Sequence, residues 1–195
     1  MESRFFWLDL IESAWRRRPI VWLSGVRRSG KTTLARSLAN ATYFDCELPR
    51  IRALLEDPEE FYDSLDTKRV ILDEIHRLPN PSEFLKIAAD HYPKLRVLAT
   101  GSSTLSATAK FSDTLTGRKE DIRITPFNSD DLIVFNISDL KKRLHRGGLP
   151  PFFLNPEYPE REFQEWMDSF WAKDVQELFR LEKRASFQKF LEVAT

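Results

Sequence analysis

The stretch "GVRRSGKTTL", residues 25–34, decides the fold that the rest of the chain predicts. It satisfies the pattern G-x-x-x-x-G-K-[ST], in which a tight loop holds phosphate with backbone N–H groups that point inward. Glycine is required in such a loop where a side chain would block the phosphate or where φ is positive. We expect the contacts to the nucleotide to come from seven residues: Gly25, Arg28, Ser29, Gly30, Lys31, Thr32 and Thr33.

Two of these residues have chemistry beyond backbone contact. The ammonium group of Lys31 reaches the outer phosphates in this pattern, and the hydroxyl group of Thr32 ligates Mg²⁺. A buried strand is expected before the loop and a helix after it, and the positive end of that helix dipole faces the anion. The sequence therefore predicts a site for a Mg²⁺-bound phosphate compound.

Short apolar runs on both sides of the loop predict a parallel sheet. Five runs qualify as strands, at residues 20–23, 42–45, 69–72, 95–100 and 121–125. Stretches with helical patterns lie between them, which implies right-handed crossovers and helices on both faces of the sheet. Runs such as "IVWL" are apolar throughout, as in strands that are buried on both sides. We therefore expect an α/β fold with a five-stranded parallel sheet.

Helix starts are marked by their side chains. In "DPEEFYDSL", Asp57 can cap a helix, with a proline in the first turn and Glu60 three residues after the cap. The stretch "NPSEFLKIAADHYP" repeats this scheme from Asn80 onward. The N-terminal stretch "FFWLDLIESAW" carries apolar residues at helical spacing, which predicts an amphipathic helix. After about residue 140 the strand signal stops, so we divide the chain into a core at 1–140 and a helical segment at 141–195, the start of a further domain.

Composition limits the classes of function. The 195 residues include 30 basic and 30 acidic side chains, a balance that argues against a nucleic-acid coat or a polybasic membrane anchor. No apolar run approaches the roughly 20 residues that a membrane span needs. Cys46 is the only cysteine, so an intrachain disulfide is impossible. We expect a soluble, cytoplasmic protein without a membrane partner.

The stretch "RVILDEIH" ends an apolar strand with two carboxylates. The carboxyl ends of parallel strands form the ligand crevice, so Asp73 and Glu74 should face the loop. Asp73 can hold the Mg²⁺ shell opposite Thr32, and Glu74 can polarise an attacking water near the γ-phosphate. In "VLATGSST", Thr100, Ser102 and Ser103 follow another buried strand, and one of their hydroxyl or amide groups should meet the γ-phosphate or the water.

These motifs together carry a family resemblance. In order, "GVRRSGKTTL", "VILDEIH", "ATGSS", "LTGRKEDIRITPF" and "GGLPPFF" resemble the prokaryotic AAA+-type P-loop ATPases, in which an ATPase core precedes a C-terminal domain of unknown function. The resemblance covers roughly residues 10–175. It implies ATP binding and hydrolysis with Mg²⁺, on a core whose sensor strand lies between the loop strand and the acid strand. It identifies Ser102 as the nearest sensor candidate and matches Arg118 to a family arginine.

Arg118 has three possible roles. It stands just before the strand that begins near residue 121, at the edge of the sheet opposite the expected nucleotide. A structural arginine would pair with Asp113 or Glu120. An arginine finger would instead serve the site of a neighbouring subunit in a homo-oligomer. A contact with the nucleotide of its own chain is the third role.

The sequence favours an ATPase that acts as a conformational switch on a protein or nucleic-acid partner. One alternative is a phosphotransferase that uses the same loop. The other is a nucleotide-dependent module that binds DNA or protein with negligible turnover, for which "LKKRLHR", residues 140–146, offers a small basic face. Family members continue for about as long again beyond "SFQKFLEVAT", so we expect the chain to be a fragment or a truncated gene product.

Overall fold

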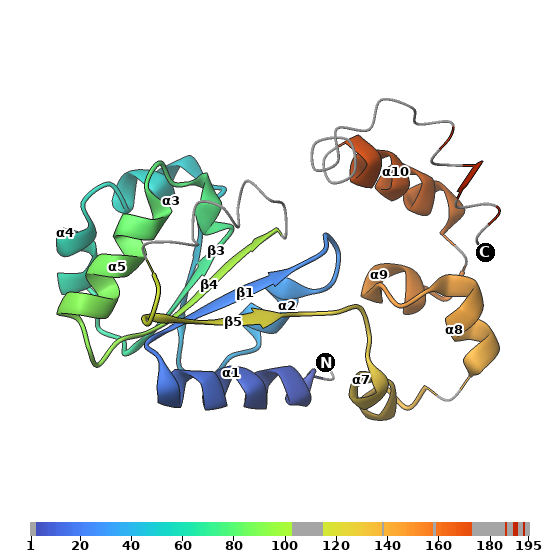
Figure 1. Ribbon diagram of the computed structural model, residues 1–195, viewed down its shortest axis with the longest axis horizontal. Coiled ribbons are helices and arrows are strands. Elements are labelled where there is room, and N and C mark those ends of the chain that lie inside the picture. Colours follow the sequence, from blue (N-terminus) through green and yellow to red (C-terminus); the bar gives the residue numbers. More distant parts are fainter. Residues whose placement is uncertain are drawn as a thin grey trace. The chain divides into compact units, whose positions relative to one another are not determined.

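Five strands form one parallel sheet in the described part of the chain, in the order β2-β3-β4-β1-β5 (Figure 1). Their bounds are β1 Ile20–Gly25, β2 Thr42–Asp45, β3 Arg69–Asp73, β4 Arg96–Ser102 and β5 Lys119–Arg123. The predicted fold class is confirmed, and each predicted strand lies within two residues of the observed one. β4, which carries the expected sensor, pairs with both β1 and β3, as the family resemblance implies.

The computed structural model describes residues 3–102, 115–137, 139–157 and 159–172, with positions 186, 189, 190 and 193. The chain divides into two units, Met1–Phe153 and Leu154–Thr195. The boundary predicted at residue 140 falls inside the first unit. The further domain that the sequence suggests beyond it stays a prediction.

Alternate residues of the central strands enter two different cores. Ile20 and Trp22 of β1 belong to one hydrophobic cluster, and Val21 and Leu23 belong to the other. All four are at most 3% exposed. Successive side chains of a strand point to opposite faces of the sheet, so an unbroken apolar strand needs cover on both sides.

Helices supply this cover. α1 (Phe5–Arg17) and α2 (Lys31–Arg36) bury their apolar residues on one face of the sheet. On the other face lie α3 (Pro49–Leu54), α4 (Pro58–Asp63), the 3₁₀ turn η1 (Ile75–Arg77) and α5 (Pro81–His91). Figure 1 shows the sheet between these two groups. The phosphate loop therefore stands on a strand that is packed from both sides.

The two predicted helix caps differ in outcome. The side chain of Asp57 accepts hydrogen bonds from the N–H groups of Glu59 and Glu60, at 3.0 and 3.1 Å, and the predicted cap of α4 is confirmed. The predicted cap by Asn80 is wrong, because this side chain makes no cap hydrogen bond to α5. The backbone explains the difference: ψ is 105° at Asp57 but 65° at Asn80, away from the extended conformation that a capping residue adopts.

Three short helices follow β5 in the first unit: α7 (Ser129–Val134), α8 (Leu140–Arg146) and α9 (Pro150–Phe153). The backbone of Phe127 ties them to the end of the sheet. Its N–H donates to the carbonyl of Gly148 at 2.8 Å, and its carbonyl accepts from Arg143 at 2.6 Å. The ring of Phe127 also packs against Phe153, with 5.8 Å between the ring centroids. These helices therefore belong with the core.

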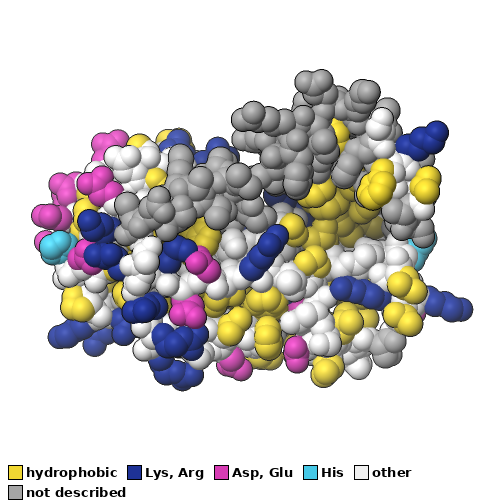
Figure 2. Space-filling view, in the orientation of Figure 1, with side chains coloured by type: hydrophobic (Ala, Val, Ile, Leu, Met, Phe, Trp, Pro, Cys, Tyr) yellow, Lys and Arg dark blue, Asp and Glu magenta, His cyan; other side chains and the backbone are white. Residues whose placement is uncertain are grey.

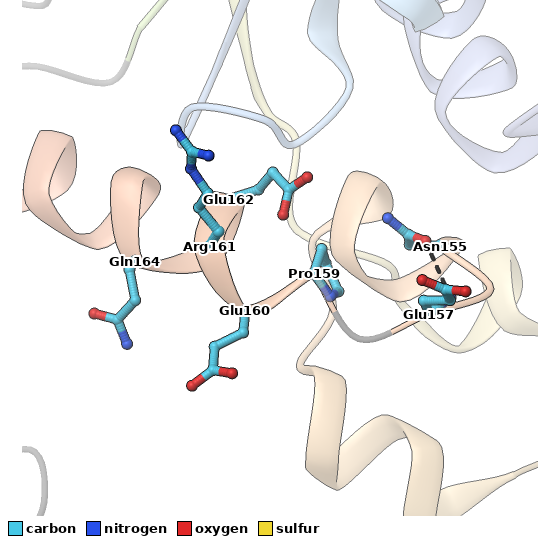
Figure 3. A pocket seen from close by; sticks show the side chains of 7 residues that line it. All are labelled: Asn155, Glu157, Pro159, Glu160, Arg161, Glu162 and Gln164. Carbon is cyan, nitrogen blue, oxygen red and sulfur yellow. Dashed lines mark hydrogen bonds between the residues drawn. The ribbon is translucent and has the colours of Figure 1, made fainter.

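In the second unit, α10 spans Glu160–Phe170. The rings of Phe163, Trp166 and Phe170 follow one another along it, with centroid separations of 5.8 and 5.3 Å. A pocket of about 630 Å³ lies around its start, where Glu157, Glu160 and Glu162 contribute to the lining (Figure 3). With three carboxylates and one basic side chain, Arg161, in its lining, this pocket does not favour a phosphate compound.

Candidate nucleotide-binding site

The phosphate loop connects β1 to α2, and each of its two glycines has its own structural reason. A Cβ atom on Gly25 would lie 2.6 Å from both the Cγ2 atom and the carbonyl oxygen of Ile124, so the neighbouring chain leaves no room for a side chain. Gly30 has a φ of 92°, in the left-handed region that side chains disfavour. Arg28 also adopts a positive φ, of 65°. The sequence pattern thus forms the sharp loop that it predicts.

Lys31 is the first residue of α2, and its side chain folds back over the loop. Its Nζ atom donates to the carbonyls of Gly25 and Val26, at 2.9 and 3.2 Å. Only 7% of the residue is exposed. The loop therefore holds a positive charge among its own backbone groups, as the binding of an outer phosphate requires.

The other predicted loop contacts are placed differently. The guanidinium group of Arg28 lies over the ring of Phe152, 5.3 Å from its centroid. Thr33 is exposed on the first turn of α2. Ser29 is fully buried, and within the described residues its Oγ atom has no hydrogen-bond partner. A buried hydroxyl without a protein partner is uncommon, and this group fits a loop that binds a ligand.

Thr32 and Asp73, the predicted metal site, are brought together. The Oγ1 atom of Thr32 donates to Oδ2 of Asp73 at 2.8 Å. The same carboxylate oxygen accepts from the hydroxyl of Tyr43 at 2.6 Å, and Oδ1 accepts from the hydroxyl of Thr100. Asp73 is only 3% exposed, so these donors take the place of water around a buried carboxylate.

Strand register explains how these groups meet. Leu72 lies opposite Ala99 and Leu23 lies opposite Thr100, so β3, β4 and β1 end at the same edge of the sheet. Asp73 closes β3 at this edge. Thr100 enters the site through its side chain, whereas the sequence identified Ser102 as the sensor. Ser102 closes β4 opposite Gly25, which places its backbone beside the loop; its role stays a prediction, and Ser103 lies outside the described residues.

The backbone changes direction at Glu74, directly after β3. Its φ of 54° is in the left-handed region, which is unusual for a residue with a side chain. Its N–H donates to Thr100 Oγ1 at 3.1 Å, and its Oε2 atom lies 3.1 Å from Nδ1 of His76. Burial raises the pKa of this carboxyl, but His76 and the charges of Lys31 and Arg27 outweigh it and lower the pKa overall. Glu74 is therefore ionised at neutral pH, as a proton acceptor must be.

Arg118 lies far along the chain from this group and at the other end of the strands. It precedes β5, and its Nε and Nη2 atoms donate to the carboxylate of Asp90 in α5, at 2.6 and 3.1 Å. The expected partner Glu120 pairs instead with Arg17 of α1, at 3.0 Å, which corrects that pairing. In the strand register, Glu120 of β5 lies opposite Val21 of β1, whose side chain faces the α1 side of the sheet. Asp90 belongs to α5, on the other side of the sheet. Asp113 lies outside the described residues.

These side chains and the loop form a donor set that fits a nucleotide with Mg²⁺. Backbone amides and an ammonium group suit phosphate oxygens, and a hydroxyl with a carboxylate suits a hard cation. Tyr43 was missed by the sequence reasoning. The signal that could have found it is strand pairing: Tyr43 lies in β2, the neighbour of the acid strand, two residues before the partner of Asp73.

Comparison with known proteins now identifies the class. Residues 17–133 match the AAA domain family. The chain belongs to this family of P-loop ATPases, whose members bind nucleotides, and the resemblance noted in the sequence is confirmed.

Individual relatives show how much of each protein's length the similarity covers. The uncharacterized proteins Mb2031c of Mycobacterium bovis and Rv2008c of Mycobacterium tuberculosis are each 31% identical over 147 residues, which cover 73% of this chain and 32% of theirs. The chain thus spans about a third of the length of these curated relatives. The Walker-type ATPase PABY2304 of Pyrococcus abyssi has a TM-score of 0.57 at 17% identity, covering 95% of this chain and 77% of its own. At this identity the likeness shows the fold alone.

On the face drawn in Figure 2, Lys and Arg side chains are interspersed with Asp and Glu, in keeping with 30 basic and 30 acidic residues. Among the described residues, no helix has the length and apolar character needed to cross a membrane.

Proposed function

We propose that this chain binds ATP with Mg²⁺ and hydrolyses it to ADP and phosphate, and that the reaction drives a conformational switch. The observation that carries the proposal is the hydrogen bond of 2.8 Å between Thr32 and the buried carboxylate of Asp73, next to Lys31 and the ionised Glu74. A loop that only binds phosphate has no need of a second carboxylate at this edge of the sheet.

Each residue has a distinct part in this proposal. Lys31 exchanges its bonds to loop carbonyls for the outer phosphates. Thr32 and Asp73 would hold Mg²⁺, which neutralises charge on the phosphate oxygens. Glu74 accepts the proton of the water that attacks the γ-phosphate, a role that requires the ionised carboxylate which the lowered pKa maintains. Thr100 and Ser102 stand beside them at the end of β4, as candidate contacts to the phosphate or the water.

The test is release of phosphate from Mg·ATP by the purified chain without any added acceptor. Glu74→Gln should leave binding intact and lower turnover by at least about 10², the low end for loss of a general base. Glu47→Gln is the matched control, because this exposed carboxylate pairs with Arg77 on the surface. Parental turnover in Glu74→Gln would contradict the role of Glu74 as the base.

The same assay separates the alternatives. A phosphotransferase would consume ATP only when an acceptor is present. A nucleotide-dependent binding module would retain ATP affinity and show negligible turnover both with and without DNA. Faster phosphate release on addition of DNA would favour a nucleic-acid partner over a protein partner.

We also propose a cytoplasmic location. Cys46 is buried, and burial raises the pKa of its thiol to about 12, so it is a stable reduced thiol. A chain with one such cysteine gains nothing from an oxidising compartment.

A further inference from the structure

A buried ion pair lies directly behind the phosphate loop. Arg4 and Asp131 are 7% and 1% exposed. The Nε and Nη2 atoms of Arg4 donate to the two carboxylate oxygens of Asp131, at 2.9 and 2.5 Å. The guanidinium carbon also lies 5.3 Å from the ring centroids of both Trp7 and Phe127. The position of the guanidinium group is therefore fixed on several sides.

The remaining donors of Arg4 reach the backbone of the site. Its Nη1 atom donates to the carbonyl oxygen of Ser29, in the phosphate loop, at 2.8 Å. Its Nη2 atom also donates to the carbonyl of Thr125, just after β5, at 3.1 Å. Asp131 is anchored in turn, because its Oδ2 atom accepts from the N–H of Asn128 at 3.0 Å in the capping box of α7. One arginine thus connects the loop, the end of the sheet and α7. Figure 1 shows α7 near the start of α1.

Peptide geometry gives this contact a consequence for ligand binding. In a planar trans peptide, the C=O of one residue and the N–H of the next point in opposite directions. Holding the Ser29 carbonyl towards Arg4 therefore directs the N–H of Gly30 to the other side. A phosphate loop binds anions only when such N–H groups converge on the ligand. A Cβ atom built on Gly30 would lie 3.7 Å from the Nη1 atom of Arg4, so the guanidinium group lies close to this peptide.

We propose that Arg4 is a positioning residue for nucleotide binding: held by Asp131, it orients the Ser29–Gly30 peptide so that the Gly30 amide faces the phosphates, and it thereby links nucleotide binding to α7. The inference rests on the proposed binding of nucleotide and adds residues that lie outside the loop motif. Arg4 touches neither the nucleotide nor the reacting atoms. It acts through the backbone of Ser29.

The first test is affinity for Mg·ADP, measured by calorimetry. The double variant Arg4→Met/Asp131→Leu removes both charges, so that neither is left buried without its partner. We expect it to fold and to bind Mg·ADP about tenfold more weakly than the parent, the scale of one hydrogen bond to a charged group. The matched control is Arg17→Gln/Glu120→Gln. This double variant removes a different ion pair, which joins α1 to β5 at an exposed position. Its affinity should equal that of the parent.

The second test observes the peptide itself. The chain contains six glycines, so ¹⁵N-glycine labelling gives a simple spectrum. In the nucleotide-free protein, the Gly30 amide signal should shift in the double variant and, to a smaller extent, in Arg4→Lys, whose single head group cannot make all the bonds. Signals of Gly117 and Gly147 should stay in place. A purely stabilising ion pair would not single out Gly30.

The outcomes are distinguishable. If the parent protein does not bind Mg·ADP, the proposed function fails and this inference fails with it. If the parent binds and the double variant binds equally well with an unchanged Gly30 signal, only the role of Arg4 is overturned. If the double variant does not fold, Arg4→Lys decides the question by the same two measurements.

Discussion

Lys31 is the side chain on which nucleotide binding depends most directly. Its ammonium group lies within the loop, in contact with the backbone carbonyls of Gly25 and Val26. We predict that Lys31→Ala abolishes ATP binding, because it removes the cation directed at the outer phosphates. A fluorescence titration of the folded variant measures this, with Lys86→Ala, an exposed lysine of α5, as the control. Unchanged ATP affinity in Lys31→Ala would contradict the assignment of the site.

Tyr43 supports Asp73 from the neighbouring strand. Its hydroxyl group donates to the carboxylate at 2.6 Å, and the phenol pKa is raised, first by burial and then by this hydrogen bond to Asp73. The phenol therefore keeps its proton and donates at any ordinary pH. We predict that Tyr43→Phe lowers the free energy of unfolding by about 1 kcal/mol, because a largely buried carboxylate loses a donor.

Urea unfolding measures the effect of Tyr43→Phe. Tyr92→Phe is the matched control, since the hydroxyl of Tyr92 donates to the exposed Asp63 at 2.9 Å, where water can replace it. Equal losses in the two variants would contradict a special role for Tyr43 at Asp73.

At this scale the sequence indicated some of the candidate residues and gave no sign of others. Lys31, Thr32 and Asp73 belong to motifs whose chemistry is local, so spacing alone makes them candidates. Arg4 and Asp131 are 127 positions apart and meet only because α1 and α7 fold to the same side of the loop. A lone arginine before a helix carries no local pattern that indicates such a partner.

Among the elements, α4 and α5 offer a paired test of helix capping. Both begin with proline after a polar residue, but only Asp57 bonds to the first turn with its side chain. We predict that Asp57→Ala lowers the free energy of unfolding by about 1 kcal/mol, whereas Asn80→Ala changes it little. Thermal or urea unfolding of the two variants decides the matter. A loss in Asn80→Ala as large as that in Asp57→Ala would contradict the capping assignment.

The central strands could be predicted from sequence closely because runs such as those of β1 and β3 are short and apolar and end in polar residues. The segment after residue 140 could be predicted as helical, but its first helices could not be assigned to the core. Their attachment depends on contacts such as Arg143 with the carbonyl of Phe127 and Phe127 with Gly148. Each of these contacts ends on a backbone group of a residue well separated in the sequence, and no local pattern of side chains indicates it.

For the whole molecule, Arg118 decides whether one subunit completes the site of another. Its ion pair with Asp90 in its own chain favours a structural role. We predict that Arg118→Ala keeps its ATP turnover and loses a little stability, whereas loss of an arginine finger would lower the rate by roughly 10³ or more.

Mixing Arg118→Ala with Lys31→Ala provides the complementary measurement. If Arg118 acts between subunits, mixed interfaces pair an intact loop with an intact arginine, and activity lost in both variants partly returns. Recovery of this kind, at concentrations where subunits associate and exchange, would overturn the structural role. If the mixture is no more active than its Arg118→Ala subunits alone, the structural role of Arg118 is supported.

The strand order has a consequence for how the protein is made. Ile20 pairs with Val97 on one side and with Lys119 on the other, so β1 has no neighbour until β4 and β5 have been synthesised. The phosphate loop leaves the ribosome before the two strands that hold it, with the 70 residues 26–95 between β1 and β4. Closing such long loops is slow, and unpaired strands tend to aggregate in the meantime. A nascent chain that stops before β4 therefore carries the complete glycine-lysine motif without the sheet that would let it bind a nucleotide.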